Sequence, residues 1–325
     1  MNRIQAVLDR LNEVPDLSAR RDAPLAPCTR FGIGGPADIL IETPNTGSFV
    51  RALDIARSCG VPTTVIGGGT NLVVADDGYR GAVLKLTSDF IESNGETILV
   101  AAGTVLQNLV DYTVDHGLRG LETMTGIPGS VGGAIYGNAG AYGHSMMERV
   151  SFVSFFDGEK VRNFSGAECG FDYRTSIFKS HKDWIIFSAV LTMLPGDSAA
   201  LRETAGRILD TRNKKYPPAM KCAGSIFKNF LLRDLPPEVA AIVPPNAVIE
   251  GKVPSAWFLE QVGAKGMRAG DIRVADYHAN LIYNEGHGTA REVARIIREL
   301  KRRIRERWGI AIEEEVQYVG FRENS

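Results

Sequence analysis

Glycine is concentrated in the stretch TGIPGSVGGAIYGNAGAYG, Thr125 to Gly143, to a degree that few packed core segments tolerate. Such a segment predicts a loop whose backbone must approach another group closely. Pro128 and Gly129 predict a turn, Ser130 can cap a short helix beginning at Val131, and the free amides of that helix end would accept a pyrophosphate. A loop that packs closely for structural reasons alone is the alternative. The glycines of this stretch are Gly126, Gly129, Gly132, Gly133, Gly137, Gly140 and Gly143.

A second glycine run, GGGTN, spans Gly67 to Asn71 and follows the apolar segment VPTTVI. It is no Walker loop, because the G-K-[ST] signature is absent, and the extended pattern of LVVADDGYRGAVLKL after it does not fit a dinucleotide fingerprint. Taken alone, this run favours a tight turn that needs positive φ. Two glycine cradles with strands between them nevertheless suit a long ligand with a diphosphate in its middle.

The bulk composition excludes several classes of protein. A chain of 325 residues with 44% hydrophobic residues predicts two or three domains. The formal net charge of −1 gives no general attraction to nucleic acid or anionic membrane. Four cysteines without a C-x-x-C spacing argue against a zinc site and a disulfide framework, and favour a reducing cytosol. The N-terminal pattern, with Ile4, Val7, Leu8 and Leu11 on one helical face, does not resemble a signal peptide, and no apolar run is long enough to span a bilayer.

The order of local patterns predicts an α+β organisation. Between Cys28 and about Leu86 the pattern predicts short strands that are interrupted by glycines, and a helix from Ser48 to Cys59. Strand patterns such as TILVAAG and RVSFVSFF follow, with a helix after Thr104. The pair Pro217 and Pro218 predicts a boundary before another unit.

The last long helix is predicted to begin after Thr289, which forms a capping-box pattern with Glu292. Its arginines alternate with Glu292, Glu299 and Glu306, and this pattern favours a solvated, ion-paired face over a nucleic-acid interface. Its apolar stripe consists of Val293, Ile296, Ile297, Leu300 and Ile304.

Six motifs, in order from about residue 20 to residue 320, resemble the UDP-N-acetylenolpyruvoylglucosamine reductase (MurB) family. They are TRFGIGGPAD, VIGGGTNLVV, GIPGSVGGAIYGNAGAYG, YRTSIFK, GSIFKN and EEEVQYVG. The resemblance implies a FAD-binding fold of the vanillyl-alcohol-oxidase type, with two α+β subdomains and a third α+β substrate-binding domain. The implied domains are an N-terminal helix at 1–19, FAD-binding subdomain 1 at 20–86 plus 306–325, FAD-binding subdomain 2 at 87–214, and a substrate-binding domain at 215–305.

The family resemblance implies a reaction in peptidoglycan precursor synthesis. NADPH reduces non-covalently bound FAD, and the flavin N5 then passes hydride to the enolpyruvyl ether of UDP-N-acetylglucosamine enolpyruvate, giving UDP-N-acetylmuramate. Charge develops on the substrate carboxylate, so the site needs donors at that carboxylate and an acid for the adjacent carbon. By resemblance Arg174 grips the carboxylate and Ser225 donates the proton. Glu315 either polarises the enol or tunes Arg174 and the substrate carboxyl group.

Glu315 lies in IAIEEEVQYV, where a strand would place it opposite Ile310, Ile312, Val316 and Tyr318. Glu314 stands where the family has a proline. The interval from Phe187 to Lys215 is too short for the insertion that carries a substrate-capping tyrosine, so the chain resembles the shorter subtype.

Further contacts follow from the same resemblance, and no metal is implied. The expected substrate-binding residues are Tyr173, Lys215, Lys228, Asn229 and His278; for His278 a structural role is the alternative. The expected cofactor-binding residues are Gly67, Gly68, Gly69, Thr70, Asn71, Gly126, Ile127, Pro128, Gly129, Ser130, Gly132, Gly133, Asn138, Ala139 and Gly140.

Two other functions are consistent with parts of the pattern. Another non-covalent FAD oxidoreductase of the same fold would keep the glycine loops, and a nucleotide-binding regulatory protein would need no turnover. The joint presence of Arg174, Ser225 and Glu315 argues against a pure binding protein, because binding alone needs no proton donor. We expect the enzyme to be cytoplasmic, to bind no nucleic acid and not to insert into a membrane.

Overall fold

Helices and sheets pack as two separate units in the computed structural model, which describes residues 3–321. Of the described residues, the first unit contains 3–23, 37–68 and 80–218, and the second contains 24–36, 69–79 and 219–321. The last segment of the first unit ends at Pro218. The finer division into three domains stays a prediction.

One sheet of the first unit has the strand order β1-β2-β5-β3. Its strands are β1 (Ser18–Pro24), β2 (Pro36–Thr43), β5 (Tyr79–Leu86) and β3 (Thr63–Val65), and β3 runs parallel to β5. Helix α2 (Thr46–Ser58) begins after Asn45, whose side chain accepts a hydrogen bond from the Ser48 amide at 3.0 Å. This confirms the helix predicted at Ser48 to Cys59.

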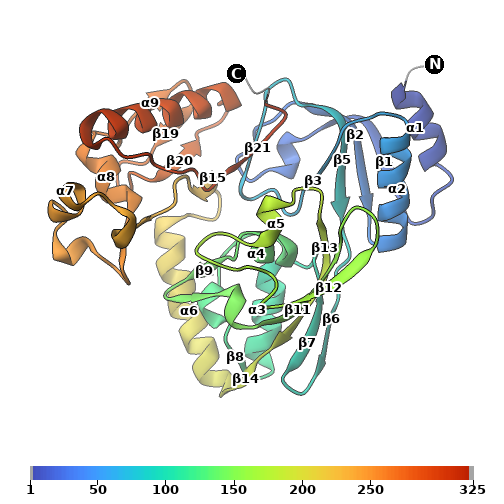
Figure 1. The fold of residues 1–325 in the computed structure, drawn as a ribbon, viewed down its shortest axis with the longest axis horizontal. Coiled ribbons are helices and arrows are strands. Elements are labelled where there is room, and N and C mark those ends of the chain that lie inside the picture. Colours follow the sequence, from blue (N-terminus) through green and yellow to red (C-terminus); the bar gives the residue numbers. More distant parts are fainter. Residues whose placement is uncertain (1–2, 322–325) are drawn as a thin grey trace. The chain divides into compact units, whose positions relative to one another are not determined.

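The N-terminal helix is shorter than predicted. Helix α1 (Arg3–Leu11) buries Val7 and Leu11 and lies beside α2 (Figure 1). The chain then turns and enters β1 at Ser18, so residues 1–19 do not form one helix. Pro15 explains the early end, because proline removes a helical donor and clashes with the preceding turn. Met1 and Asn2 lie outside the described residues.

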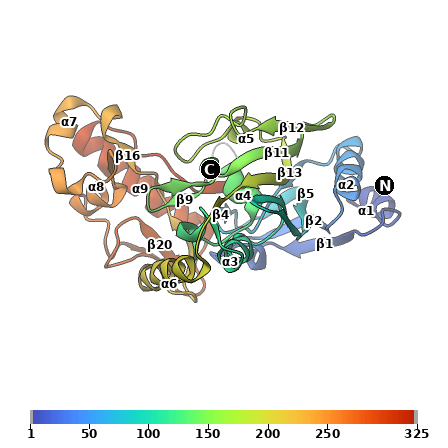
Figure 2. The same cartoon turned by 90° about the horizontal axis from the view of Figure 1, so that it is seen from below.

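A five-stranded sheet forms the rest of the first unit's framework, with the order β12-β11-β13-β7-β6 and antiparallel pairing throughout. Helices α3 (Leu106–Asp115) and α6 (Ser198–Lys215) lie side by side (Figure 2). The buried Phe155 ring of β11 meets the Phe178 and Trp184 rings at centroid distances of 5.2 and 4.8 Å. The strands are β6 (Ile91–Asn94), β7 (Thr97–Ala101), β11 (Val150–Phe156), β12 (Val161–Ser165) and β13 (Ile185–Thr192).

Short elements complete the first unit. The helices among them are α4 (Val131–Tyr136) and α5 (Ile177–Ser180), with 3-10 turns at Glu122–Met124 and Met146–Glu148. The short strands are β8 (Leu118–Arg119), β9 (Gly140–Ala141), β10 (His144–Ser145) and β14 (Leu194–Pro195).

The second unit is built on a sheet with the order β15-β20-β19-β18. A separate parallel pair joins β4 (Leu72–Val74) to β21 (Gln317–Val319), so β21 lies against the segment that follows the first glycine run. The sheet strands are β15 (Lys221–Ser225), β18 (Arg268–Ala269), β19 (Ile272–Val274) and β20 (Leu281–Asn284). The other short elements are β16 (Phe230–Leu231), β17 (Lys252–Val253), α7 (Pro237–Ala241) and α8 (Ser255–Gln261). The 3-10 turns lie at Ala26–Cys28, Leu232–Asp234 and Pro245–Ala247.

Helix α9 (Ala290–Trp308) confirms the pattern predicted for the last helix. Thr289 and Glu292 form the capping box, and all five residues of the apolar stripe are buried. Glu299 and Glu306 pair with Arg302 at 2.7 and 2.6 Å, which confirms the ion-paired face for these two acids. Within residues 3–321, no helix has both the length and the apolar character that crossing a bilayer would require.

Candidate active site

The two glycine stretches meet within the first unit. A Cβ on Gly67 would lie 2.7 Å from the Ser130 Oγ, and one on Gly68 would lie 3.0 Å from the Cα of Gly129. Side chains at these positions would therefore force the two loops apart. The result is a stretch of bare backbone from two loops, which fits the close approach of a diphosphate.

The start of α4 lacks the free amides that the sequence predicted for binding an anion. Ser130 does cap this helix, since its side chain accepts a hydrogen bond from the Gly133 amide at 3.3 Å. The Val131 amide, however, donates to the carbonyl of Thr104 and the Gly132 amide to that of Ala102, at 2.9 and 2.8 Å. The expectation of free amides is wrong, because the neighbouring β7–α3 connection already uses them.

The end of the first glycine run belongs to the second unit. Gly69 has φ +64°, and a Cβ there would lie 1.7 Å from the carbonyl oxygen of Cys28. The side-chain amide of Asn71 donates a 2.9 Å hydrogen bond to the carbonyl of Glu315. The Asn71 carbonyl in turn accepts from the Gln317 amide at 2.9 Å. Asn71 thus ties a predicted cofactor loop to a predicted catalytic residue.

The side chain of Asn138 forms hydrogen bonds with backbone groups of the protein. This residue is buried and has φ +42°. Its Nδ2 donates to the Asp172 carbonyl at 2.9 Å, and its Oδ1 accepts from the Met147 amide at 3.0 Å. Any cofactor contact of Asn138 would therefore come from its backbone, while its side chain holds the turn that carries Arg174.

Arg174 lies at the tip of a tight turn in the first unit. The amides of Asp172 and Thr175 each donate to the other residue's carbonyl at 3.2 Å, and Arg174 between them has φ +54°. A non-glycine residue in this region is strained, and such strain is common at functional sites. The guanidinium donates to the Gly140 carbonyl at 2.8 Å and lies 5.3 Å from the centroid of the Tyr173 ring. The Tyr173 ring is therefore in contact with the side chain of Arg174.

Two basic residues near the C-terminal end of α6 flank one aromatic ring. The Lys215 ammonium and the Arg212 guanidinium lie 5.1 and 5.7 Å from the Tyr216 ring centroid. Arg212 also lies against Gly126, where a Cβ would come within 3.2 Å of its Nε. Lys215 was predicted from the sequence but Arg212 was not; the basic run TRNKK was its signal.

Ser225 ends β15 in the second unit, directly after a β-bulge. Cys222 pairs with Tyr283 and Ser225 pairs with Leu281, so one extra residue is accommodated on β15. Gly224 supplies the required left-handed conformation with φ +75°. A bulge changes the direction of the side chains beside it, and the side chain beside this bulge is that of Ser225, the predicted proton donor.

Glu315 is held next to the Ser225 segment by the backbone. Its amide donates to the Ile226 carbonyl at 2.8 Å, and Glu314 forms an isolated bridge with Phe227. The predicted strand is only partly correct, since a regular strand spans Gln317–Val319 alone. Ile310, Ile312 and Val316 are buried as expected, but Tyr318 is exposed.

The other predicted substrate contacts surround the same segment. Lys228 pairs with Glu313 at 3.0 Å, and the Asn229 Oδ1 accepts from the Ser255 amide at 3.2 Å. The half-buried His278 accepts a hydrogen bond from the Asn280 amide at its Nδ1, at 3.3 Å. Asn280 itself was not predicted; its signal was a second polar residue within the apolar motif YHANLIYN.

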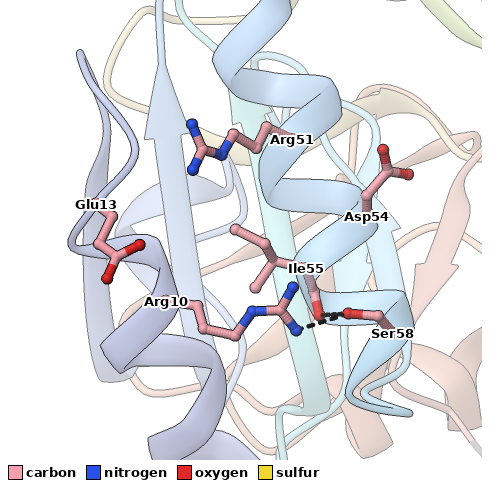
Figure 3. A pocket seen from close by; sticks show the side chains of 6 residues that line it. All are labelled: Arg10, Glu13, Arg51, Asp54, Ile55 and Ser58. Atoms are coloured by element: carbon pink, nitrogen blue, oxygen red, sulfur yellow. Dashed lines mark hydrogen bonds between the residues drawn. The ribbon is translucent and has the colours of Figure 1, made fainter.

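A shallow hollow of about 360 Å³ lies elsewhere on the first unit, beside α1 and α2 (Figure 3). Arg10 and Glu13 face it from one side, and Arg51 and Asp54 come from α2. Its charges are of both signs, so it offers no preference for an anionic nucleotide. The predicted site residues do not line it.

Comparison with known proteins assigns the chain to a family. The model of the UDP-N-acetylenolpyruvoylglucosamine reductase C-terminal domain matches residues 216–319, and that of an FAD-binding domain matches residues 37–159. The UDP-N-acetylenolpyruvoylglucosamine reductase of Solibacter usitatus is 60% identical over 96% of this chain and 100% of its own length. The chain belongs to the UDP-N-acetylenolpyruvoylglucosamine reductase family. The Bacillus subtilis reductase, at 33% identity over 98% of this chain and 99% of its own length, is a more distant relative.

A solved structure gives the same answer for the fold. The crystal structure of the reductase from Thermus caldophilus matches with a TM-score of 0.71 and 28% identity, over 93% of this chain and 98% of that one. The predicted family, the α+β FAD-binding fold and FAD as cofactor are thereby confirmed.

Proposed function

We propose that this reductase-family member catalyses the NADPH-dependent reduction of UDP-N-acetylglucosamine enolpyruvate to UDP-N-acetylmuramate, a step of peptidoglycan precursor synthesis. The observation that carries the proposal is the hydrogen bond from the Glu315 amide to the carbonyl of Ile226, which follows Ser225. This bond joins the backbone segments that carry the Ser225 hydroxyl and the Glu315 carboxylate, which supports a role for both in a proton-transfer step at one carbon.

FAD, when bound, supplies the hydride. The residues proposed to hold it non-covalently are the bare backbone of Gly67, Gly68 and Gly129, whose loops meet, together with Gly69 and Thr70. The basic end of α6 offers Lys215 as a point charge for the diphosphate of the sugar nucleotide. Asn229, Lys228 and His278 are proposed to orient the substrate.

Three side chains are proposed to act at the reacting atoms. Arg174 binds the substrate carboxylate and stabilises the charge that develops there, since a guanidinium stays charged and can form two parallel bonds. Ser225 donates a proton to the adjacent carbon. Glu315 polarises the enol. Arg174 enters this role pre-organised, because its left-handed turn and the Gly140 carbonyl fix its direction.

The proposed partners are therefore the sugar nucleotide and NADPH. We place the enzyme in the cytoplasm, where NADPH is supplied, and the net charge of −1 gives no reason to expect nucleic acid as a partner.

Stopped-flow absorbance of the purified protein tests the proposal. The protein should be yellow, and heat or acid should release free FAD. Anaerobic NADPH should bleach the flavin, and the enolpyruvyl sugar nucleotide should restore its colour, whereas UDP-N-acetylglucosamine should not. A flavin that NADPH reduces but this substrate leaves reduced would indicate a different FAD oxidoreductase of the same fold.

A further inference from the structure

Asn280 makes an unusual set of contacts inside the second unit. It is 3% exposed and lies directly before β20. Its side-chain Nδ2 donates to the Phe227 carbonyl at 2.8 Å, and its Oδ1 accepts from the Phe227 amide at 2.9 Å. Its own carbonyl accepts from the Ile226 amide at 3.1 Å. One residue thus satisfies both backbone groups of Phe227 and one of Ile226.

These bonds begin where the β15–β20 ladder stops. The regular pairing ends at Ser225 opposite Leu281, and the bulge at Gly224 has already disturbed it. A strand end after a bulge is normally free to fray, because its next amide and carbonyl lack partners. The side-chain amide of Asn280 supplies the two hydrogen-bond partners that a neighbouring strand would otherwise give the Phe227 backbone. The backbone amide of Glu315 donates to the Ile226 carbonyl at 2.8 Å.

We propose that Asn280 is a positioning residue for the proton-transfer step, which acts by clamping Phe227 and thereby fixing Ser225 and Glu315 relative to each other. This inference rests on the proposed function, in which Ser225 is the proton donor. Asn280 reaches the chemistry only through the backbone of residues 226 and 227. A misplacement of about 1 Å at a reacting group can cost about a hundredfold in rate, so a clamp of this kind has a measurable effect.

The clamp needs a donor and an acceptor on one short side chain. Asparagine provides both, whereas an ionised aspartate offers only acceptors and would face the Phe227 carbonyl. A protonated aspartic acid has nearly the shape of asparagine and regains the donor. Burial favours this neutral form, so the clamp in Asn280→Asp should re-form as the pH falls.

The chain offers a matched control in Asn284, the last residue of β20. Asn284 is also buried, at 5% exposure. Its side chain also bonds to backbone, donating to the Phe31 carbonyl at 3.1 Å and accepting from the Gly286 and Gly288 amides at 2.9 Å. Its bonds go to other segments than 225–227. Substitutions at Asn284 therefore report the general cost of losing a buried amide.

The experiment compares Asn280→Asp, Asn280→Ala, Asn284→Asp and the parent, each loaded with FAD, in the two half-reactions from pH 5.5 to 8.5. The titratable groups on the adjoining segments are His278, Lys228, Glu313, Glu314 and Glu315, and Lys301 pairs with Glu314 at 3.0 Å. Dividing each variant's rate by that of the parent removes their common contribution. For Asn280→Asp we expect near-parental flavin reduction by NADPH, at least tenfold slower reoxidation by the enolpyruvyl substrate at pH 8.5, and recovery towards pH 5.5.

A second readout does not depend on turnover. Hydrogen exchange of a peptide covering residues 222–230 should be faster in Asn280→Ala than in the parent or in Asn284→Ala, because the Phe227 amide loses its acceptor.

Two outcomes would overturn the inference. One is reoxidation of Asn280→Asp at the parental rate at pH 8.5. The other is equal slowing of both half-reactions with the same loss of melting temperature as Asn284→Asp, which would make Asn280 merely structural. A parent enzyme that the substrate does not reoxidise would instead refute the proposed function, so the two failures are distinguishable.

Discussion

The amide of Glu315 donates a 2.8 Å hydrogen bond to the carbonyl oxygen of Ile226. Two residues far apart in the sequence, Ser225 and Glu315, thereby lie on adjoining segments of one unit. The Asn71 side chain extends this arrangement, since it donates to the Glu315 carbonyl at 2.9 Å from the end of the first glycine run. A change at Asn71, Ser225 or Glu315 should therefore alter the rate of the same half-reaction, the reoxidation of the flavin by the substrate.

Replacing Ser225 by alanine should separate the two half-reactions. Flavin reduction by NADPH requires no proton from this side chain and should stay near the parental rate. Reoxidation by UDP-N-acetylglucosamine enolpyruvate should fall by about a hundredfold to ten-thousandfold, the usual contribution of a general acid. Stopped-flow absorbance measures both rates. Ser225→Cys keeps a donor and should retain measurable activity, and an alanine variant that reoxidises as fast as the parent would make the serine structural.

Replacing Arg174 by lysine should slow turnover much more than it slows flavin reduction. A lysine keeps the charge but loses the two-point grip on a carboxylate, and the loss of one such donor costs about tenfold to a thousandfold in kcat. Arg162→Lys is the control, because Arg162 pairs with Asp157 at the surface of β12 and should leave both rates unchanged. Equal damage to both half-reactions would place Arg174 at the cofactor instead.

The sequence predicted those parts of the fold that depend on local signals. The capping box at Thr289, the apolar stripe of α9 and the Ser130 cap were correct, because each depends on residues within a few positions of one another. The shorter N-terminal helix was missed although Pro15 was its signal.

Long-range contacts account for what the sequence could not predict. The amides of Val131 and Gly132 appeared available for an anion, but Thr104 and Ala102 occupy them through tertiary contacts. Asn138 and Asn71 were expected at the cofactor, yet their side chains bind the backbone of Asp172 and Glu315. A sequence pattern gives the type of a polar residue but not which distant backbone group it satisfies.

The pH dependence of stability should include a distinct contribution from Glu299 in α9. Hydrogen bonds from Arg302 and Arg303 lower the pKa of this carboxyl from 4.5 to about 2. A carboxyl with a depressed folded-state pKa stabilises the protein above its unfolded pKa and loses that effect as the pH falls towards the folded value. The melting temperature of Glu299→Gln should therefore lie below that of the parent near neutral pH, and the gap should narrow from about pH 4.5 downwards.

A Glu299→Gln gap that stays constant down to the lowest pH at which both proteins remain folded would show that the ion pairs with Arg302 and Arg303 contribute nothing.

Gly69→Ala should greatly weaken FAD binding, and a second glycine separates strain from steric clash. Gly69 and Gly95 both have left-handed backbones, with φ +64° and +58°. An alanine at either carries a conformational cost of about 1–2 kcal/mol. At Gly95 an added Cβ meets no atom within 4 Å, whereas at Gly69 it would lie 1.7 Å from the Cys28 carbonyl oxygen and must displace the loop. Gly95→Ala should thus lower the melting temperature while keeping its flavin content, and Gly69→Ala should be purified largely colourless. Titration with FAD, followed by flavin fluorescence, measures the loss. If Gly69→Ala binds FAD as tightly as Gly95→Ala does, the first glycine run does not hold the cofactor, and the second run, around Gly129, would have to do so alone.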